Sequence, residues 1–201
     1  DEVICGFGRT GNMWGSETFN IKPDIVTAAK ALSSAYLPIS AVIISEKVYG
    51  PIKDQANELG IFGHGYTYSA HPVCAAVAMK TQQIMIDRNI IENVKQLSKL
   101  FNERIQNIKN NSWFLSHARS VGLIGAVEFG YGGNKKFDIK NKIAAKCAKI
   151  IQENGVILRA LPGDIIGFCP PLIIKEEQIN EMFDKIDTAF KSFDQMAFNL
   201  K

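Results

Sequence analysis

The sequence predicts an α/β protein, with part of a mostly parallel sheet first and a smaller α/β unit after it. Two patterns support this class. The first apolar runs have strand length and do not alternate strictly with polar residues, as in strands buried on both faces of a parallel sheet. Later segments space their apolar residues as helices do, and short strand-like runs separate them.

Three runs in the first part predict strands at residues 2–7, 24–30 and 40–45, separated by loops that carry Gly, Pro or Asn. A long helix is then predicted over 71–89. Pro72 suits its first turn, where a missing backbone N–H costs nothing, and alanines follow.

The second part predicts a compact unit that is joined to the first through helices rather than through a flexible linker. Residues 90–109 place their apolar side chains on one face at helical spacing, which predicts an amphipathic helix. The remaining predicted elements are a strand at 121–129, a helix at 138–155 closed by Gly155, a strand pair at 156–161 and 164–170, and a last helix at 175–193.

Composition excludes several classes of protein. With 201 residues, of which 46% are hydrophobic and 21% charged, the chain is globular and large enough for a real core. Lys and Arg number 23 against 20 Asp and Glu, without a basic stretch long enough to follow a phosphate backbone, so a nucleic acid is not an expected partner. No apolar run approaches the ~20 residues of a membrane helix, and no signal peptide is recognisable, so we expect a cytoplasmic protein without a membrane partner.

The cysteines predict neither disulfides nor a metal site. They show no CxxC pair, and only three histidines could help them bind a metal. We therefore interpret them as buried thiols in a reducing compartment, and they are Cys5, Cys74, Cys147 and Cys169.

Lys30 and Asp1 are the first candidates for chemistry. Lys30 ends the run "DIVTAAK" and precedes the small and hydroxylated residues "ALSSAY". A lysine removed from water there would be an amine nucleophile able to attack an aldehyde, although a lysine at a strand end can also simply extend into solvent. The Asp1 carboxylate could pair with a pyridinium nitrogen. Lysine and aspartate together are the pair that a pyridoxal phosphate site requires.

Three stretches, "DEVICGFGRTG" through "DIVTAAKALSSAY", "FGHGYTYSAHPVCAAVA" and "GVILRALPGDIIGFCPPLII", occur in this order. In that order they resemble the class III pyridoxal-phosphate aminotransferases, the ω-amino acid and amine transaminases, nearly end to end. The resemblance implies fold type I, the aspartate aminotransferase-like fold. Residues 1–88 would be the C-terminal part of the large cofactor-binding domain, and residues 89–201 the small C-terminal α/β domain.

The resemblance also implies roles for three residues around the cofactor ring. Lys30 matches the lysine that binds the cofactor aldehyde and then carries a proton between the substrate α-carbon and the cofactor C4′ atom. Asp1 matches the partner of the pyridine nitrogen, and Val3 matches the apolar residue against one ring face. These roles agree with the chemistry inferred from Lys30 and Asp1 alone.

Two further stretches match sites for the phosphate and the substrate. Thr67 matches the threonine whose hydroxyl binds the cofactor phosphate of the neighbouring subunit, with the backbone around Tyr66 close by, which implies a homodimer with a shared active site. Arg159 matches the arginine that binds a substrate carboxylate, for which a planar guanidinium is suited. Without the family context, the Thr67 loop would be a surface loop and Arg159 a solvated side chain.

The implied reaction moves an amino group from an ω-amino acid or amine, such as 4-aminobutyrate or β-alanine, to a keto acid such as pyruvate. Two alternatives remain open. One is another class III enzyme, an aminomutase, a racemase or a lyase, and the other is a non-catalytic module that keeps the fold.

The start of the chain leads to an expectation about its completeness. The chain begins on Asp-Glu without methionine or a helix cap, which is typical of a C-terminal fragment. In the resembling family the N-terminal half supplies the phosphate-binding loop, the aromatic residue on the other ring face and much of the substrate pocket. These 201 residues by themselves are therefore expected to bind the cofactor weakly and to be inactive.

Overall fold

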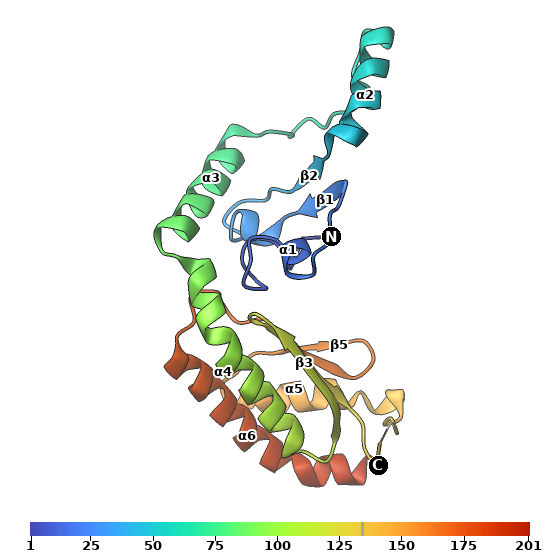
Figure 1. Cartoon of the computed structure of the whole chain (residues 1–201). Helices are drawn as coiled ribbons and strands as arrows, with labels where there is room; N and C mark the ends of the chain where they lie inside the picture. The colour runs from blue at the N-terminus through green and yellow to red at the C-terminus, as the bar shows by residue number, and fades with distance from the viewer. Residues whose placement is uncertain (134) are drawn as a thin grey trace. The chain divides into compact units, whose positions relative to one another are not determined.

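The computed structural model describes residues 1–133 and 135–201, which form two compact units, Asp1–Glu92 and Asn93–Lys201. Both units mix helices and strands (Figure 1). Unit 1 contains α1 (Gly15–Thr18), β1 (Ile25–Ala28), the 3-10 helix η1 (Lys30–Leu32), β2 (Ala41–Ile44), α2 (Glu46–Leu59) and α3 (Pro72–Asp87). Helix α4 (Ile90–Asn110) begins in unit 1 and ends in unit 2. Unit 2 continues with β3 (Leu115–Val121), β4 (Ile124–Phe129), η2 (Ile139–Asn141), α5 (Ile143–Glu153), β5 (Arg159–Leu161), β6 (Ile165–Phe168) and α6 (Glu176–Asn199).

The sheet of unit 1 differs from the predicted one. Strands β1 and β2 form an antiparallel pair, with Ile25 opposite Ile44 and Ala28 opposite Ala41, so the parallel pairing expected for the first part is wrong for the described strands. Burial on both faces is also wrong for β2, because Val42 and Ile43 point to opposite faces and are 69% and 47% exposed. The apolar runs predicted β1 and β2 as strands but did not define their direction or what covers them.

The strand predicted at residues 2–7 is a series of turns. The Gly6 amide donates to the Glu2 carbonyl oxygen at 2.9 Å, which bends the chain away from an extended path. A Cβ at Gly6 would lie 2.7 Å from that oxygen, so the turn requires a glycine there. Phe7 then takes a left-handed φ of 61°. Only the start of this stretch runs beside β1. There the Glu2 amide donates to the Thr27 carbonyl oxygen at 2.8 Å.

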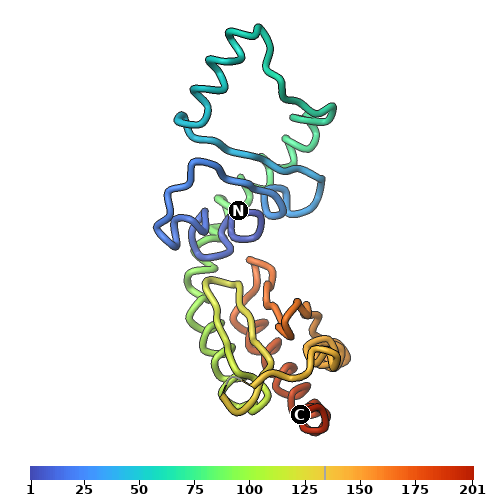
Figure 2. The backbone as a smooth tube through the Cα atoms, turned by 90° about the vertical axis from the view of Figure 1, so that its right-hand side faces the viewer, coloured from blue at the N-terminus to red at the C-terminus, as the bar shows by residue number. Residues whose placement is uncertain are grey.

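Unit 1 contains the long helix that the sequence predicted, α3, and a second long helix, α2. Helix α3 begins at Pro72 with His71 as its N-cap, as the predicted helix over 71–89 requires. Helix α2 was not among the predicted elements. It includes Pro51 and ends at Gly60, whose φ of 68° suits a left-handed C-cap. Both views show the segment between α2 and α3 as an extended stretch of backbone (Figures 1 and 2).

Unit 2 confirms most of the predicted order of elements. Its four-stranded sheet is antiparallel throughout, in the order β3-β4-β6-β5. The strand predicted over 121–129 is β4, which begins only at Ile124, and β3 before it was not predicted. Gly122, with a φ of 55°, lies in the turn between the two strands. Helix α5 is shorter than the predicted helix at 138–155, since Lys142 is left-handed and ends η2 there. Helix α6 extends past residue 193 to Asn199.

One face of this sheet carries the core. Val127 lies opposite Ile166 and both are fully buried, as is Phe168 at the next position of that face. Helix α4 packs on the same face, because a Cβ on Gly125 would meet the Ile105 side chain. Each large side chain buried in this way contributes about 1.5–3 kcal/mol. The apolar face of the strands, defined by their period-2 pattern, and the apolar face of α4, defined by its helical pattern, therefore pack together in one core.

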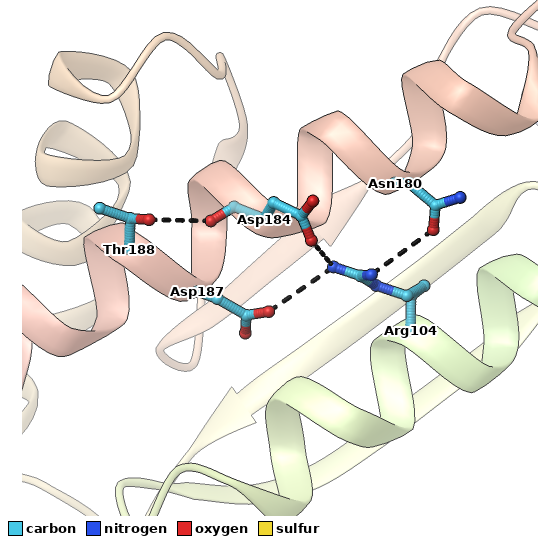
Figure 3. A network of polar contacts seen from close by, with 5 residues as sticks. All are labelled: Arg104, Asn180, Asp184, Asp187 and Thr188. Atoms are coloured by element: carbon cyan, nitrogen blue, oxygen red, sulfur yellow. Dashed lines mark hydrogen bonds and ion pairs between the residues drawn. The ribbon is translucent and has the colours of Figure 1, made fainter.

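Helices α4 and α6 lie side by side and are joined by a polar network centred on Arg104 (Figures 1 and 3). Its guanidinium donates to the carboxylate of Asp184 at 2.5 Å and to the amide oxygen of Asn180 at 3.4 Å, and it lies 3.6 Å from Asp187. The same guanidinium lies 5.6 Å from the centre of the Phe183 ring. Arg104 therefore fixes the register of the two helices at the edge of the core.

Asp187 is expected to reduce stability slightly at neutral pH. Burial raises the pKa of its carboxyl, and the nearby Asp184 raises that pKa further, against the lowering effects of Arg104 and Lys191. Since the pKa is raised in the folded state, the carboxyl favours folding below its unfolded pKa, and this contribution is lost as the pH rises through the folded pKa. Asp187→Asn should therefore raise the free energy of unfolding at pH 7. The gain should stay below about 1 kcal/mol, because 41% of the side chain is exposed.

Urea unfolding of the two proteins measures this difference. The gap between them should close as the pH falls below the unfolded value of 3.8, where the carboxyl is protonated in both the folded and the unfolded state. A gap that widens on acidification would contradict the assignment.

Candidate active site

Asp1 lies beside β1. Its Oδ1 atom accepts a hydrogen bond from the Val3 amide at 2.8 Å and one from the Thr27 hydroxyl at 3.5 Å. Lys30 follows Thr27 by three residues, which an extended chain spans in about 10 Å. Asp1 and Val3 therefore lie beside Thr27, near the end of β1, and the Lys30 backbone follows that end of the strand.

Glu2 anchors this arrangement and was not predicted. Its side chain is 5% exposed and accepts the amides of Gly15 at 2.9 Å and Ser16 at 2.7 Å, at the start of α1. Burial alone would raise the pKa of Glu2, but the backbone hydrogen bonds from Ser16 and Gly15 outweigh it and lower that pKa. Glu2 is thus held as a carboxylate next to Asp1. The signal in the sequence for this role of Glu2 is its position directly after Asp1.

Lys30 begins η1 and has a left-handed φ of 44°. Its side chain is exposed, as in the alternative in which a lysine at a strand end extends into solvent. The strand-end position is as predicted, because β1 ends two residues earlier, at Ala28. Exposure leaves the amine accessible to an aldehyde.

The turn that carries Lys30 is held by side chains that the sequence did not indicate. The Gln82 side-chain amide, on α3, donates to the carbonyl oxygens of Ala31 at 3.1 Å and Leu32 at 3.0 Å. The Ser33 hydroxyl donates to the Leu37 carbonyl oxygen at 2.7 Å, and Ser33 is 2% exposed. Gln82 is distant from the turn in sequence, so no local pattern could have pointed to it.

Tyr66 and Thr67 lie in the extended segment between α2 and α3 and are exposed. The Tyr66 ring is 77% exposed and meets the His64 ring edge-on, with their centres 5.4 Å apart. The Ser69 amide donates to the Tyr66 carbonyl oxygen at 3.0 Å, which forms a turn around Thr67. The Thr67 hydroxyl is therefore presented on the surface of unit 1.

Arg159 lies in unit 2, as the first residue of β5 opposite Gly167. Its side chain is exposed. Two hollows on the described surface, of about 580 and 440 Å³, also belong to unit 2, and none of the predicted site residues lines them. The candidate site in unit 1 is thus an exposed surface around the end of β1 rather than an enclosed cavity.

The residues at β1 fit pyridoxal phosphate by the chemistry of their donor set. Lys30 offers an accessible amine for its aldehyde, and the Asp1 carboxylate is held by donors that both reach Oδ1, which leaves Oδ2 for a protonated ring nitrogen. Within residues 1–133 and 135–201, no cluster of three or more His, Cys, Asp or Glu side chains could hold a metal ion.

The thiols and the helices test two further expectations. Burial is confirmed for Cys147, where it raises the pKa of the thiol, but Cys169 is exposed, so the prediction of four buried thiols is wrong. Cys5 and Cys74 are half-buried, and no disulfide joins the four. Over the described part of the chain, no helix is both long enough and apolar enough to span a membrane.

Comparison with known proteins identifies similar sequences over the whole length. The model of the family "Aminotransferase class-III" matches residues 1–190. An uncharacterised aminotransferase, y4uB, of Sinorhizobium fredii is 43% identical over 195 residues, which are 96% of this chain and 42% of that protein. The chloroplastic gamma aminobutyrate transaminase 3 of Solanum lycopersicum is 43% identical over 203 residues, 100% of this chain and 39% of its own length. The chain therefore spans about two fifths of these relatives.

Solved structures agree with the sequence matches. A transaminase with L-Ala is similar with a TM-score of 0.93 at 40% identity, over 98% of this chain and 46% of that one. The ω-transaminase from Pseudomonas jessenii, in complex with PMP, has a TM-score of 0.90 at 37% identity, over 98% of this chain and 44% of that one. The described mixed α/β architecture is thus similar to that of transaminases.

Proposed function

The chain belongs to the class III aminotransferases, a family that depends on pyridoxal phosphate, and from this premise we propose that it carries the catalytic lysine of a transaminase. The observation that carries the proposal is the position of Asp1 and Lys30 at one end of β1. The proposed reaction transfers an amino group from an ω-amino acid or amine, such as 4-aminobutyrate or β-alanine, to a keto acid such as pyruvate. The names of the tomato relative and of the P. jessenii structure support this substrate class.

Each residue at β1 has a defined task in this proposal. Pyridoxal phosphate, when bound, supplies the electron sink for the charge that develops at the substrate α-carbon. Asp1 Oδ2 would accept a hydrogen bond from the protonated ring nitrogen, and the Val3 side chain would pack against the ring. The Lys30 amine would hold the cofactor through its aldehyde and would then act as general acid and base at the substrate α-carbon.

The other predicted residues complete the proposal at a distance from β1. Thr67 and the backbone around Tyr66 would bind the cofactor phosphate of a second subunit, so the active enzyme would be a homodimer. The exposure of this segment supports that role, since it is accessible to a partner. Arg159 would bind a substrate carboxylate through its two parallel N–H groups. A cytoplasmic location stays a prediction.

A chimera with a relative tests this function. In the chimera, residues 1–201 of this chain replace the matching segment of y4uB, and the remainder of y4uB is kept. Addition of an amino donor without a keto acid should convert absorbance near ~420 nm into absorbance near ~330 nm, the signature of amino transfer to the cofactor. A keto acid should reverse the change.

Two comparisons make this experiment decisive. The 201-residue chain by itself is expected to show no useful turnover, because the phosphate-binding loop and much of the substrate pocket that the family uses are not located in it. Conversion of the donor without loss of the ~420 nm absorbance would contradict transamination. It would favour an aminomutase, a racemase or a lyase of the same family.

A further inference from the structure

The turn that presents Lys30 is strained. We define the Lys30 turn as residues 29–37. Within it, Lys30, Ser34 and Ala35 have left-handed φ values of 44°, 50° and 60°. Residues with a Cβ atom rarely adopt this conformation, and it persists only where surrounding contacts hold it. The turn is therefore expected to depend on the contacts that hold it, one of which is the Ser33 hydroxyl bond to the Leu37 carbonyl oxygen inside the turn.

Hydrogen bonds inside the turn leave part of its backbone without a helical partner. The Leu32 amide donates to the Ala29 carbonyl oxygen at 3.0 Å, and the Ser33 amide donates to that of Lys30 at 3.2 Å. A helix of one turn cannot satisfy its last carbonyl groups internally. Those of Ala31 and Leu32 need a donor from elsewhere.

Gln82 supplies that donor from another element. Its single Nε2 atom, on α3, donates to both of these carbonyl oxygens, at 3.1 and 3.0 Å. The side chain is half-buried between α3 and η1. An amide nitrogen has two protons to donate, so one side chain can satisfy both groups at once. Gln82, which lies 50 residues after Leu32 in the sequence, therefore clamps the turn to α3.

We propose that Gln82 is a positioning residue for Lys30, an inference that rests on the function proposed above. A left-handed φ at Lys30 sets the direction in which its side chain leaves the backbone, and continuation of β1 would point it differently. Catalytic groups must be held within about 0.5 Å of the productive geometry by their supporting shell. Gln82 provides this support from outside the turn, through the backbone rather than through the amine.

The chain offers a matched pair of variants. Gln82→Met keeps the length of the side chain and removes both donated hydrogen bonds. Gln83→Met is the control, because Gln83 is the next residue of α3, is exposed, and donates to Asp87 at 2.7 Å instead. Thermal unfolding midpoints of both variants should stay within a few degrees of the unchanged chain, so that a general loss of folding can be recognised.

Hydrogen exchange of the 201-residue chain tests the clamp without any cofactor. Backbone amides of residues 29–37 should exchange about tenfold faster in Gln82→Met, since the loss of two hydrogen bonds opens the turn more often. The same amides should be unchanged in Gln83→Met. Equal exchange in Gln82→Met and the unchanged chain would overturn the clamp.

Covalent trapping in the chimera tests the positioning role. Pyridoxal phosphate followed by borohydride labels reactive lysines, and mass spectrometry gives the label at Lys30 relative to that at the exposed Lys80 in the same sample. This ratio should fall at least about threefold in Gln82→Met, with a matching loss of absorbance near ~420 nm, and should be unchanged in Gln83→Met. Lys80 corrects for differences in reagent and recovery between samples. General destabilisation would also lower the ratio, so the ratio is compared only after the thermal midpoints of Gln82→Met and Gln83→Met are found to agree within a few degrees.

The outcomes separate the two proposals. No trapping at Lys30 in the unchanged chimera overturns both the transaminase function and the positioning role. Trapping that is equal in the unchanged and the Gln82→Met chimeras overturns the positioning role alone.

Discussion

Lys30→Ala is expected to abolish borohydride trapping of pyridoxal phosphate at this position in the chimera and to remove the absorbance near ~420 nm. Turnover should fall by about 10²–10⁴-fold or more, because an alanine can neither bind the aldehyde nor carry the proton. Peptide mapping after reduction and a steady-state transamination assay measure the two effects.

Lys80→Ala is the matched control for this change, since Lys80 is an exposed lysine on α3. It should leave both trapping and turnover within about twofold of the unchanged chimera, as expected for a surface substitution. If the label instead maps to another lysine and survives in Lys30→Ala, the assignment of the catalytic lysine is wrong.

Phe183→Ala is expected to destabilise unit 2 by about 3–5 kcal/mol. The Phe183 side chain is 0% exposed, and its ring stacks on Phe168 and meets Phe101 edge-on, with both pairs of ring centres 5.8 Å apart. Removal of the ring leaves a cavity between α4, α6 and the sheet and takes away the surface under Arg104. This loss is a large part of the total stability of a domain.

Phe198→Ala provides the comparison within the same helix, because Phe198 is 62% exposed. Its loss should cost below about 1 kcal/mol. Urea unfolding followed by the fluorescence of Trp113, in a Trp14→Phe background, reports on unit 2 for both variants. Similar midpoints for the two variants would show that the core does not depend on the Phe183 ring.

Most elements of unit 2 could be predicted because their patterns are local. The apolar positions of α4 recur at helical spacing and end in the core of unit 2, where Val94, Phe101 and Ile105 are 0% exposed. Gly122 shows why one boundary was missed, since this left-handed residue reverses the chain inside the run that was predicted as one strand, and β4 begins only at Ile124. Periodicity predicts which face is buried, but it does not predict where the chain reverses.

Unit 1 was predicted less well because its strands depend on contacts that the sequence pattern does not contain. The run "AVII" in β2 is a strand, as expected, yet it pairs antiparallel with β1 and is exposed on both faces. An apolar run indicates a preference for burial. It does not indicate what provides the cover.

For the site, the sequence by itself determined which groups are available: Lys30 at the end of β1, Asp1 as a carboxylate, and the order of motifs that resembles one family. These features are local, so residue types and spacing suffice to define them. Only the tertiary structure decided how they are held. Thr27 fixes Asp1 beside β1, and Gln82 clamps the strained Lys30 turn from α3. Such hydrogen bonds join residues that are far apart in the chain, and folding alone determines which of them meet.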